Sequence, residues 1–170
     1  MAKMLIPELG TEITLAEDWT FELFWEHRNT KFWEILTDLN MIDENNFVPT
    51  ATVNNGYGFT KNKILKKYYE KYFKLIYDNQ LRKTVPAQGV YFCYKLTIPK
   101  GSILIIDRIY IRKGCEGYSS VTFRTKKLPF KNMKRKPRFW AKLQDVNNIV
   151  YDENALSQFL AQKVNDDQGS

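Results

Sequence analysis

The stretch that decides the fold is VYFCYKLTIPKGSILIIDRIYIR, residues 90–112. In its first part, apolar side chains recur at every second position, namely at Phe92, Tyr94, Leu96 and Ile98. This two-residue period is typical of a β-strand with one buried face. The turn formers Pro99-Lys100-Gly101 end the pattern, so a strand is predicted from Val90 to Ile98.

A second strand is predicted directly after this turn, from Ile103 to Arg112. Strict alternation places Ile103, Ile105, Ile109 and Ile111 on one face and Leu104, Ile106, Arg108, Tyr110 and Arg112 on the other. Asp107 interrupts the isoleucine face. We expect its carboxylate to form a salt bridge with Arg108, Arg112 or Arg124, or to lie at a bulge that turns it outward.

Two further strands are predicted on either side of a basic loop. After a turn at residues 114–117, the two-residue period returns from Tyr118 to Lys126 and again from Arg138 to Gln144. The faces expected to be buried carry Ser119, Val121 and Phe123 in the third strand and Phe139, Ala141 and Leu143 in the fourth. These short strands predict a curled antiparallel sheet, either open or closed into a small barrel of the SH3 or Tudor type.

The residues before this sheet favour helices. Thr14-Leu15-Ala16-Glu17 has the form of a capping box, so a helix is expected from about Leu15 until Asn40, with an aromatic core stripe that includes Phe21, Phe32 and Trp33. Residues 40–59 are rich in turn formers and are expected to be a flexible linker. Apolar residues at helical spacing, among many lysines, predict a second helix from about Thr60 to Gln80.

The predicted fold class is therefore α+β, with N-terminal helices packed on a small curled antiparallel sheet or an SH3/Tudor-like barrel. The expected organisation is a helical segment over residues 1–85, a β domain over 86–152, and a short helix with a frayed tail over 153–170, either as separate parts or as one domain. With 170 residues and 44% hydrophobic content, the chain is long enough to bury a substantial core.

The charge of the chain is unevenly distributed. Residues 1–59 carry three basic residues against ten acids, a net of −7. Residues 60–143 carry 22 basic residues against four acids, a net of +18, and residues 144–170 carry one against five, a net of −4. Repulsion among so many cations costs stability unless a counter-charge is present, and either a nucleic acid or the acidic ends of the chain supply one.

The predicted hairpin gathers cations and aromatic rings on one outer surface. We expect the nucleic-acid-binding residues to be Arg108, Tyr110, Arg112, Arg124, Lys126, Lys127, Lys131, Lys134, Arg135, Lys136, Arg138, Trp140 and Lys142. Cations neutralise the phosphate backbone and rings stack on bases or sugars. The alternative interpretation is structural: a basic loop keeps the protein soluble, lysines guard a sheet edge, and Trp140 caps a small second core.

Catalytic and metal sites find little support. His27 is the single histidine and has the pattern of a packing residue, and no cofactor-binding or zinc motif occurs. Residues 118–122 resemble the Ser-Thr-Ser strand of arginine-type ADP-ribosyltransferases, but the Glu-x-Glu pair of that family is missing. Cys93 and Cys115 lack any paired motif and are expected to be reduced, and the absence of a long apolar run indicates a cytosolic protein.

Three segments, Asp107–Arg112, Tyr118–Phe123 and Arg138–Leu143, resemble small accessory proteins of tailed bacteriophages. The resemblance covers the C-terminal half and extends to the composition, which is rich in Lys, Asn, Tyr and Phe. It implies a phage-encoded protein that acts in the host bacterial cytoplasm, where such basic proteins bind DNA or disable a host factor.

Two functions follow as hypotheses. The first is a non-enzymatic, largely sequence-independent nucleic-acid-binding protein, with DNA favoured over RNA as the partner. The second is an inhibitor or interaction protein that docks the same basic and aromatic surface on an acidic host protein. Neither hypothesis requires a cofactor or a membrane.

Overall fold

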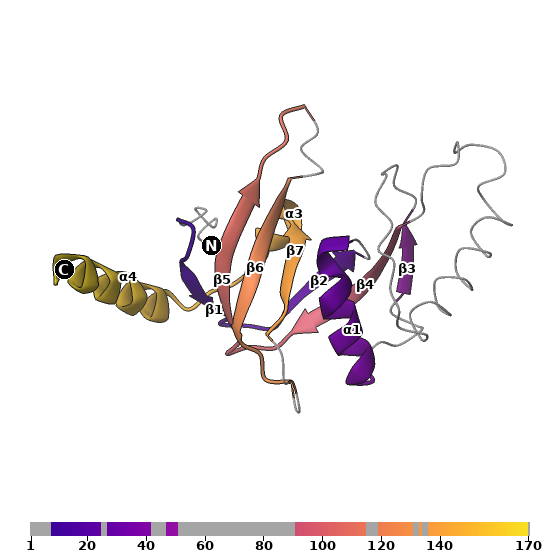
Figure 1. Ribbon diagram of the computed structural model, residues 1–170, viewed down its shortest axis with the longest axis horizontal. Helices are drawn as coiled ribbons and strands as arrows, with labels where there is room; N and C mark the ends of the chain where they lie inside the picture. Colours follow the sequence, from indigo (N-terminus) through magenta and orange to yellow (C-terminus); the bar gives the residue numbers. More distant parts are fainter. Residues whose placement is uncertain are drawn as a thin grey trace, which may run out of the picture. The chain divides into compact units, whose positions relative to one another are not determined.

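The computed structural model describes residues 8–24, 27–41, 47–50, 91–114, 119–130, 133 and 136–169 (Figure 1). The chain divides into two units, one made of residues 1–21 and 97–170 and the other of residues 22–96. The boundaries fall inside strands β2 (Trp19–Phe24) and β4 (Tyr91–Ile98). The organisation expected over residues 1–85, 86–152 and 153–170 stays a prediction.

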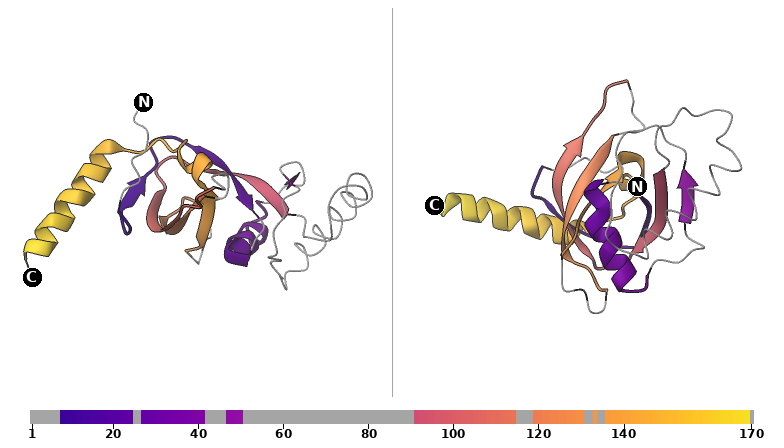
Figure 2. Two further views of the ribbon diagram at one scale, coloured as in Figure 1. Left: turned by 90° about the horizontal axis from the view of Figure 1, so that it is seen from above. Right: turned by 45° about the vertical axis from the view of Figure 1, so that its right-hand side comes forward.

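The first unit contains a four-stranded antiparallel sheet. Its order is β1 (Glu12–Thr14), β5 (Ile103–Tyr110), β6 (Ser120–Lys127) and β7 (Arg138–Lys142). The views in Figures 1 and 2 agree that β5, β6 and β7 lie side by side. The hairpin predicted around the basic loop is therefore confirmed, with β6 and β7 as its strands.

The inner face of this sheet carries an aromatic core. Val121 and Phe123 of β6 and Phe139 and Ala141 of β7 have no exposed surface, as the alternation predicts. The rings of Phe123 and Phe139 lie 5.6 Å apart, and Phe21 stacks on Phe139 at 5.4 Å. Aromatic rings bury large apolar areas, so this cluster fixes which side of the hairpin faces outward.

The predicted faces of β5 are wrong beyond its middle, because a β-bulge lies at Asp107. Ile106 pairs with Phe123 and Arg108 pairs with Thr122, which leaves Asp107 without a partner on β6. Leu104 and Ile106 are buried, whereas Arg108 and Tyr110 are exposed. The extra residue shifts the alternation by one position, so Arg108, Ile109 and Tyr110 change face, whereas Asp107 stays on the same face as Ile105.

The helix predicted from about Leu15 to Asn40 is wrong over its first half. Thr14 ends strand β1, Leu15 forms an isolated bridge with Tyr151, and β2 begins at Trp19. The Thr14 carbonyl accepts a bond from the Asp152 N–H rather than capping a helix. Trp19, Phe21 and Leu23 are all buried at alternate positions, so a two-residue period describes this segment.

The second unit contains the helical half of that segment. A 3-10 turn (His27–Asn29) leads into α1 (Thr30–Asp38), and Asn40, with φ of 54°, follows its end as predicted. The indole of Trp33 donates to the Phe24 carbonyl at 3.0 Å and meets Tyr94 edge-on. The helix thus packs on strands of a three-stranded sheet in the order β2-β4-β3.

The remaining segments confirm some expectations. Strand β3 (Phe47–Thr50) lies inside the predicted linker. Linker residues 42–46 and 51–59 lie outside the described residues, and so does the helix predicted over 60–80. The predicted C-terminal helix is present and longer, because α4 spans Glu153–Gln168 and follows the short α3 (Leu143–Val146). Asp152 caps α4, since its carboxylate accepts from the Ala155 N–H at 3.0 Å.

The α+β class is confirmed. Both described sheets have a linear strand order, so the open curled sheet is the predicted architecture that is present among the described strands. The longest described helix lies at the C-terminus rather than near the N-terminus. Cys93 is a free, buried thiol, whereas Cys115 lies outside the described residues.

Candidate nucleic-acid interface

The outer surface of β5, β6 and β7 gathers most of the described residues predicted to bind nucleic acid. We call this surface the basic face; it consists of Asp107, Arg108, Tyr110, Arg124, Lys126, Arg138, Trp140 and Lys142. The inner face of the same hairpin holds the aromatic core, so alternation forces these side chains outward. Figure 1 shows the three strands that carry them.

The strand register arranges the basic face in rows across the sheet. Thr122, on the central strand β6, pairs with Arg108 on one side and Trp140 on the other. In the next row, Ser120 pairs with Tyr110 and Lys142. In the first row, the cation Arg108 lies on β5 and the ring of Trp140 on β7. In the second row the order is reversed, with the ring of Tyr110 on β5 and the cation Lys142 on β7.

A third row brings two like charges together. Arg124 pairs directly with Arg138 across the β6–β7 hairpin. Like charges in directly opposed positions destabilise a sheet, because their side chains stand about 5 Å apart. This row therefore needs a counter-ion.

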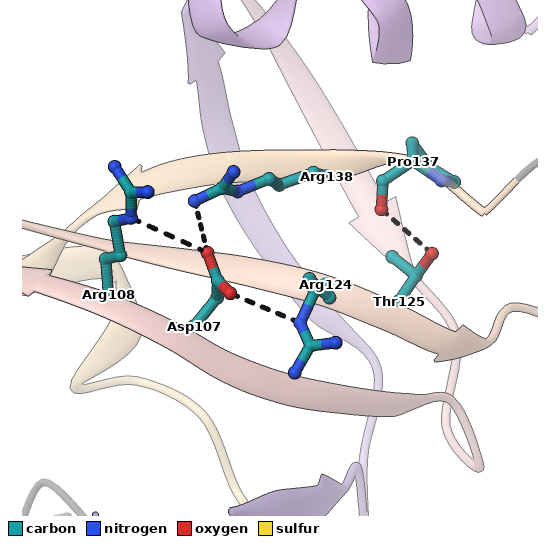
Figure 3. Close-up of polar contacts among 6 residues, drawn as sticks. All are labelled: Asp107, Arg108, Arg124, Thr125, Pro137 and Arg138. Atoms are coloured by element: carbon teal, nitrogen blue, oxygen red, sulfur yellow. Dashed lines mark hydrogen bonds and ion pairs between the residues drawn. The ribbon is translucent and has the colours of Figure 1, made fainter. Parts of the chain in front are cut away.

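Asp107 supplies that counter-ion from the bulge on β5. Its Oδ1 lies 3.2 Å from Nε of Arg124, and its Oδ2 contacts Nη2 of Arg138 and lies 4.0 Å from Nε of Arg108 (Figure 3). The expected salt bridge and the expected bulge thus occur together. The two are linked, because the bulge shifts Arg108 onto the outer face, where alternation with Ile105 already places the Asp107 carboxylate.

The three arginines keep donors for a further anion. Their side chains are 47% to 60% exposed, whereas the Asp107 side chain is 19% exposed and its Oδ2 is buried. In Figure 3 the terminal nitrogens of Arg108 and Arg124 point away from the carboxylate. One carboxylate against three guanidinium groups leaves a net of two positive charges, and each guanidinium carries five N–H donors.

A second carboxylate reaches the face from β1. The ammonium of Lys126 donates to both carboxylate oxygens of Glu12, at 2.6 and 2.8 Å. A register shift between Ile103 and Leu104 frees Lys126 from direct pairing with β5. With Glu12 and Asp107 set against its five cations, the region keeps a net of three positive charges.

The small residues of β6 form the floor of the face. Ser120 and Thr122 point outward but are only 3% and 5% exposed, and their partners on both neighbouring strands carry longer side chains. Tyr110, in contrast, is 48% exposed, and Trp140 is half-buried. Aromatic rings and cations thus make up the layer that meets solvent.

The other predicted binding residues lie at the margin of this face or outside the described residues. Lys127 is exposed at the end of β6, Lys136 is exposed just before β7, and Arg112 is exposed after β5, where its N–H bonds to the Ser119 hydroxyl at 3.2 Å. Lys131, Lys134 and Arg135 lie outside the described residues. The structure therefore brings together the strand residues of the prediction and does not place most of the loop.

Two partners in this site were missed from the sequence. Arg138 was not expected to bind Asp107, although its place opposite Arg124 in the predicted hairpin is the signal that finds it. Glu12 was missed because the short strand β1 has only three residues and was not predicted. Its contact with Lys126 spans most of the chain and has no local signal.

The described parts of the chain hold no cluster of three His, Cys, Asp or Glu side chains that suits a metal ion. No helix within them is long and apolar enough to cross a membrane. His27 lies in the 3-10 turn before α1.

Comparisons with known proteins give no relative from which to transfer a function. No family model matches the sequence, and neither the curated proteins nor the solved structures gave a significant match.

Proposed function

We propose that this chain is a non-enzymatic nucleic-acid-binding protein that recognises the phosphate backbone through the basic face, largely without reading base sequence. The observation that carries the proposal is the convergence of cations and aromatic rings from three strands onto one side of the sheet. Cations that neutralise phosphates supply most of the affinity in such proteins, and rings add contacts with bases that tolerate any sequence.

The type of cation supports this choice of ligand. The chain contains 19 lysines and seven arginines, yet three of the five cations on the basic face are arginines. Guanidinium groups bind phosphate in a bidentate manner and stack on flat rings, whereas an ammonium acts as a point charge. An arginine-rich surface with aromatic rings therefore favours binding to a polyanion with planar bases over a role in solubility alone.

The proposal also names the ligand and the cellular location. The resemblance to accessory proteins of tailed bacteriophages supports DNA as the ligand, in the cytoplasm of a bacterial host. Residual charge supports a modest footprint: a net of three positive charges matches contact with about three phosphates.

Fluorescence anisotropy with a labelled mixed-sequence oligonucleotide at low salt tests the proposal. We expect the wild type to bind. The double variant Arg108→Gln/Lys142→Gln should bind at least tenfold more weakly, because two contacts with phosphates of the nucleic acid are lost. The matched control is Lys100→Gln/Lys163→Gln, which removes the same charge from an exposed turn and from α4. Absence of binding to DNA and RNA at low salt, or equal losses in both double variants, would refute the proposal.

A further inference from the structure

The basic face carries two solvent-accessible aromatic rings, those of Tyr110 and Trp140. The core rings of Trp19, Phe123 and Phe139 are at most 2% exposed, and Phe130, Tyr151 and Phe159 are half-buried away from this face. Tyr110 is the one aromatic residue among the large exposed apolar side chains of the described part of the chain. Trp140 joins it from β7, half-buried, on the same side of the sheet.

The two rings alternate with two cations in a checkerboard. Arg108 and Tyr110 are two residues apart on β5, and Trp140 and Lys142 are two residues apart on β7. Because Arg108 shares a row with Trp140 and Tyr110 shares a row with Lys142, rings occupy one diagonal and cations the other. Strands β5 and β7 are two strand spacings apart. Each ring therefore has one cation about 7 Å away along its own strand and another about 10 Å away across the sheet.

This arrangement distinguishes between kinds of nucleic acid. In a duplex the bases are paired and stacked inside, so a flat sheet face meets only phosphates and sugars, and the rings gain little. In a single strand the bases are free to splay out and stack on aromatic side chains while the phosphates reach neighbouring cations. Only the second ligand uses both diagonals of the checkerboard.

We propose that the ligand of the basic face is single-stranded nucleic acid, with bases stacked on Trp140 and Tyr110 and phosphates held by the guanidinium groups around Asp107. This inference rests on the proposed function and narrows its ligand class. The contacts are to phosphates and to base faces, so single-stranded DNA and single-stranded RNA share the chemistry that the face recognises.

The test compares one unstructured DNA strand, the RNA strand of the same sequence, and the DNA duplex of the same length, all titrated with the full chain at one salt concentration. We expect at least one single strand to bind about tenfold more tightly than the duplex. Comparison of the DNA and RNA strands shows which of the two nucleic acids binds more tightly. Trp140→Leu should weaken single-strand binding by about 5- to 100-fold, the loss of one stacked base, with little change for the duplex.

Three further variants keep the test independent of folding. Trp140→Phe retains a ring and should restore most of the single-strand affinity. Tyr110→Leu changes a side chain that is 48% exposed and should weaken single-strand binding without lowering the melting temperature, whereas Tyr110→Phe should bind as the wild type does. Tryptophan fluorescence should be quenched by the single strand in the wild type and much less in Trp140→Phe, because Trp140 is the tryptophan on the basic face and Trp19 and Trp33, the other described ones, are buried.

The outcomes separate the two proposals. Equal affinity for single strands and duplex, with binding that still falls as salt rises, would overturn the single-strand inference and leave the proposed function standing. Unchanged single-strand affinity in both Trp140→Leu and Tyr110→Leu would also overturn it. No binding to any of the three ligands would overturn both.

Discussion

Arg124 and Arg138 stand directly opposite each other on β6 and β7, and one carboxylate, that of Asp107, contacts both. That carboxylate lies on the outer face at the bulge on β5. The same feature therefore relieves repulsion within the hairpin and limits the positive charge that the basic face offers a ligand. Stability and binding are expected to respond in opposite directions when it is removed.

Asp107→Asn tests this opposition. The free energy of unfolding should fall by roughly 0.5–1 kcal/mol, because the arginines are about half exposed and their ion pairs are partly screened by solvent. Affinity for nucleic acid should rise several-fold, since the face gains one net positive charge and loses its internal competitor for the guanidinium groups. Urea denaturation and anisotropy titration measure the two effects.

The matched control for this variant is Asp166→Asn, which removes an exposed carboxylate from α4 and should change neither quantity. A fall in affinity for Asp107→Asn would show that Asp107 acts by holding the arginines in place rather than by competing with phosphate.

Neighbouring residues on β7 should have separate effects. Phe139→Ala removes a fully buried ring from the aromatic core and should lower the free energy of unfolding by about 3–5 kcal/mol. Trp140→Leu, one position further, should cost much less stability because its side chain lies on the outer face. Chemical denaturation of the two variants measures the difference, and equal costs would contradict the assignment of faces.

The ion pair between Glu12 and Lys126 reports on the pairing of β1 with β5 at the sheet edge. A double-mutant cycle with Glu12→Gln and Lys126→Gln should give a coupling energy of about 0.2–1 kcal/mol at low salt. The coupling should shrink in high salt, since both side chains are partly exposed. Strictly additive single-variant effects at low salt would mean that the contact contributes nothing to stability.

The cap of α4 gives a local prediction. Asp152→Ala removes the acceptor for the Ala155 N–H and should cost about 0.5–2 kcal/mol of helix stability. Because α4 has no buried residues, the loss should appear as reduced helicity in circular dichroism, with a small change in the unfolding midpoint of the sheet. Asp152→Asn keeps a capping oxygen and should retain the helicity.

The sequence predicts a segment of this fold correctly where its hydrophobic period fits only one kind of secondary structure. Residues 119–142 have a clear two-residue period around a loop, and the hairpin with its inner and outer faces is present as predicted. In residues 15–24 the same aromatic residues fit both a helical and a strand period. Tertiary packing decides there, because Trp19 and Phe21 lie against Phe123 and Phe139.

The candidate site was predictable in its cations and in the counter-ion Asp107, but not in the second counter-ion, Glu12. Alternation places Arg124, Arg138 and Lys142 on one face without any knowledge of other strands. The bulge at Asp107 depends on how β5 meets β6, and the Glu12 contact depends on a pairing between distant segments. Local sequence carries no signal for a long-range partner such as Glu12.

The most direct test of the central claim is the salt dependence of nucleic-acid binding. A net of three positive charges predicts that the logarithm of the affinity falls against the logarithm of salt concentration with a slope of about −2 for a single strand and about −3 for a duplex. Arg138→Gln/Lys142→Gln should reduce the steepness by about 1.4 for a single strand. Binding that does not respond to salt, or an unchanged slope in that variant, would contradict recognition through the basic face.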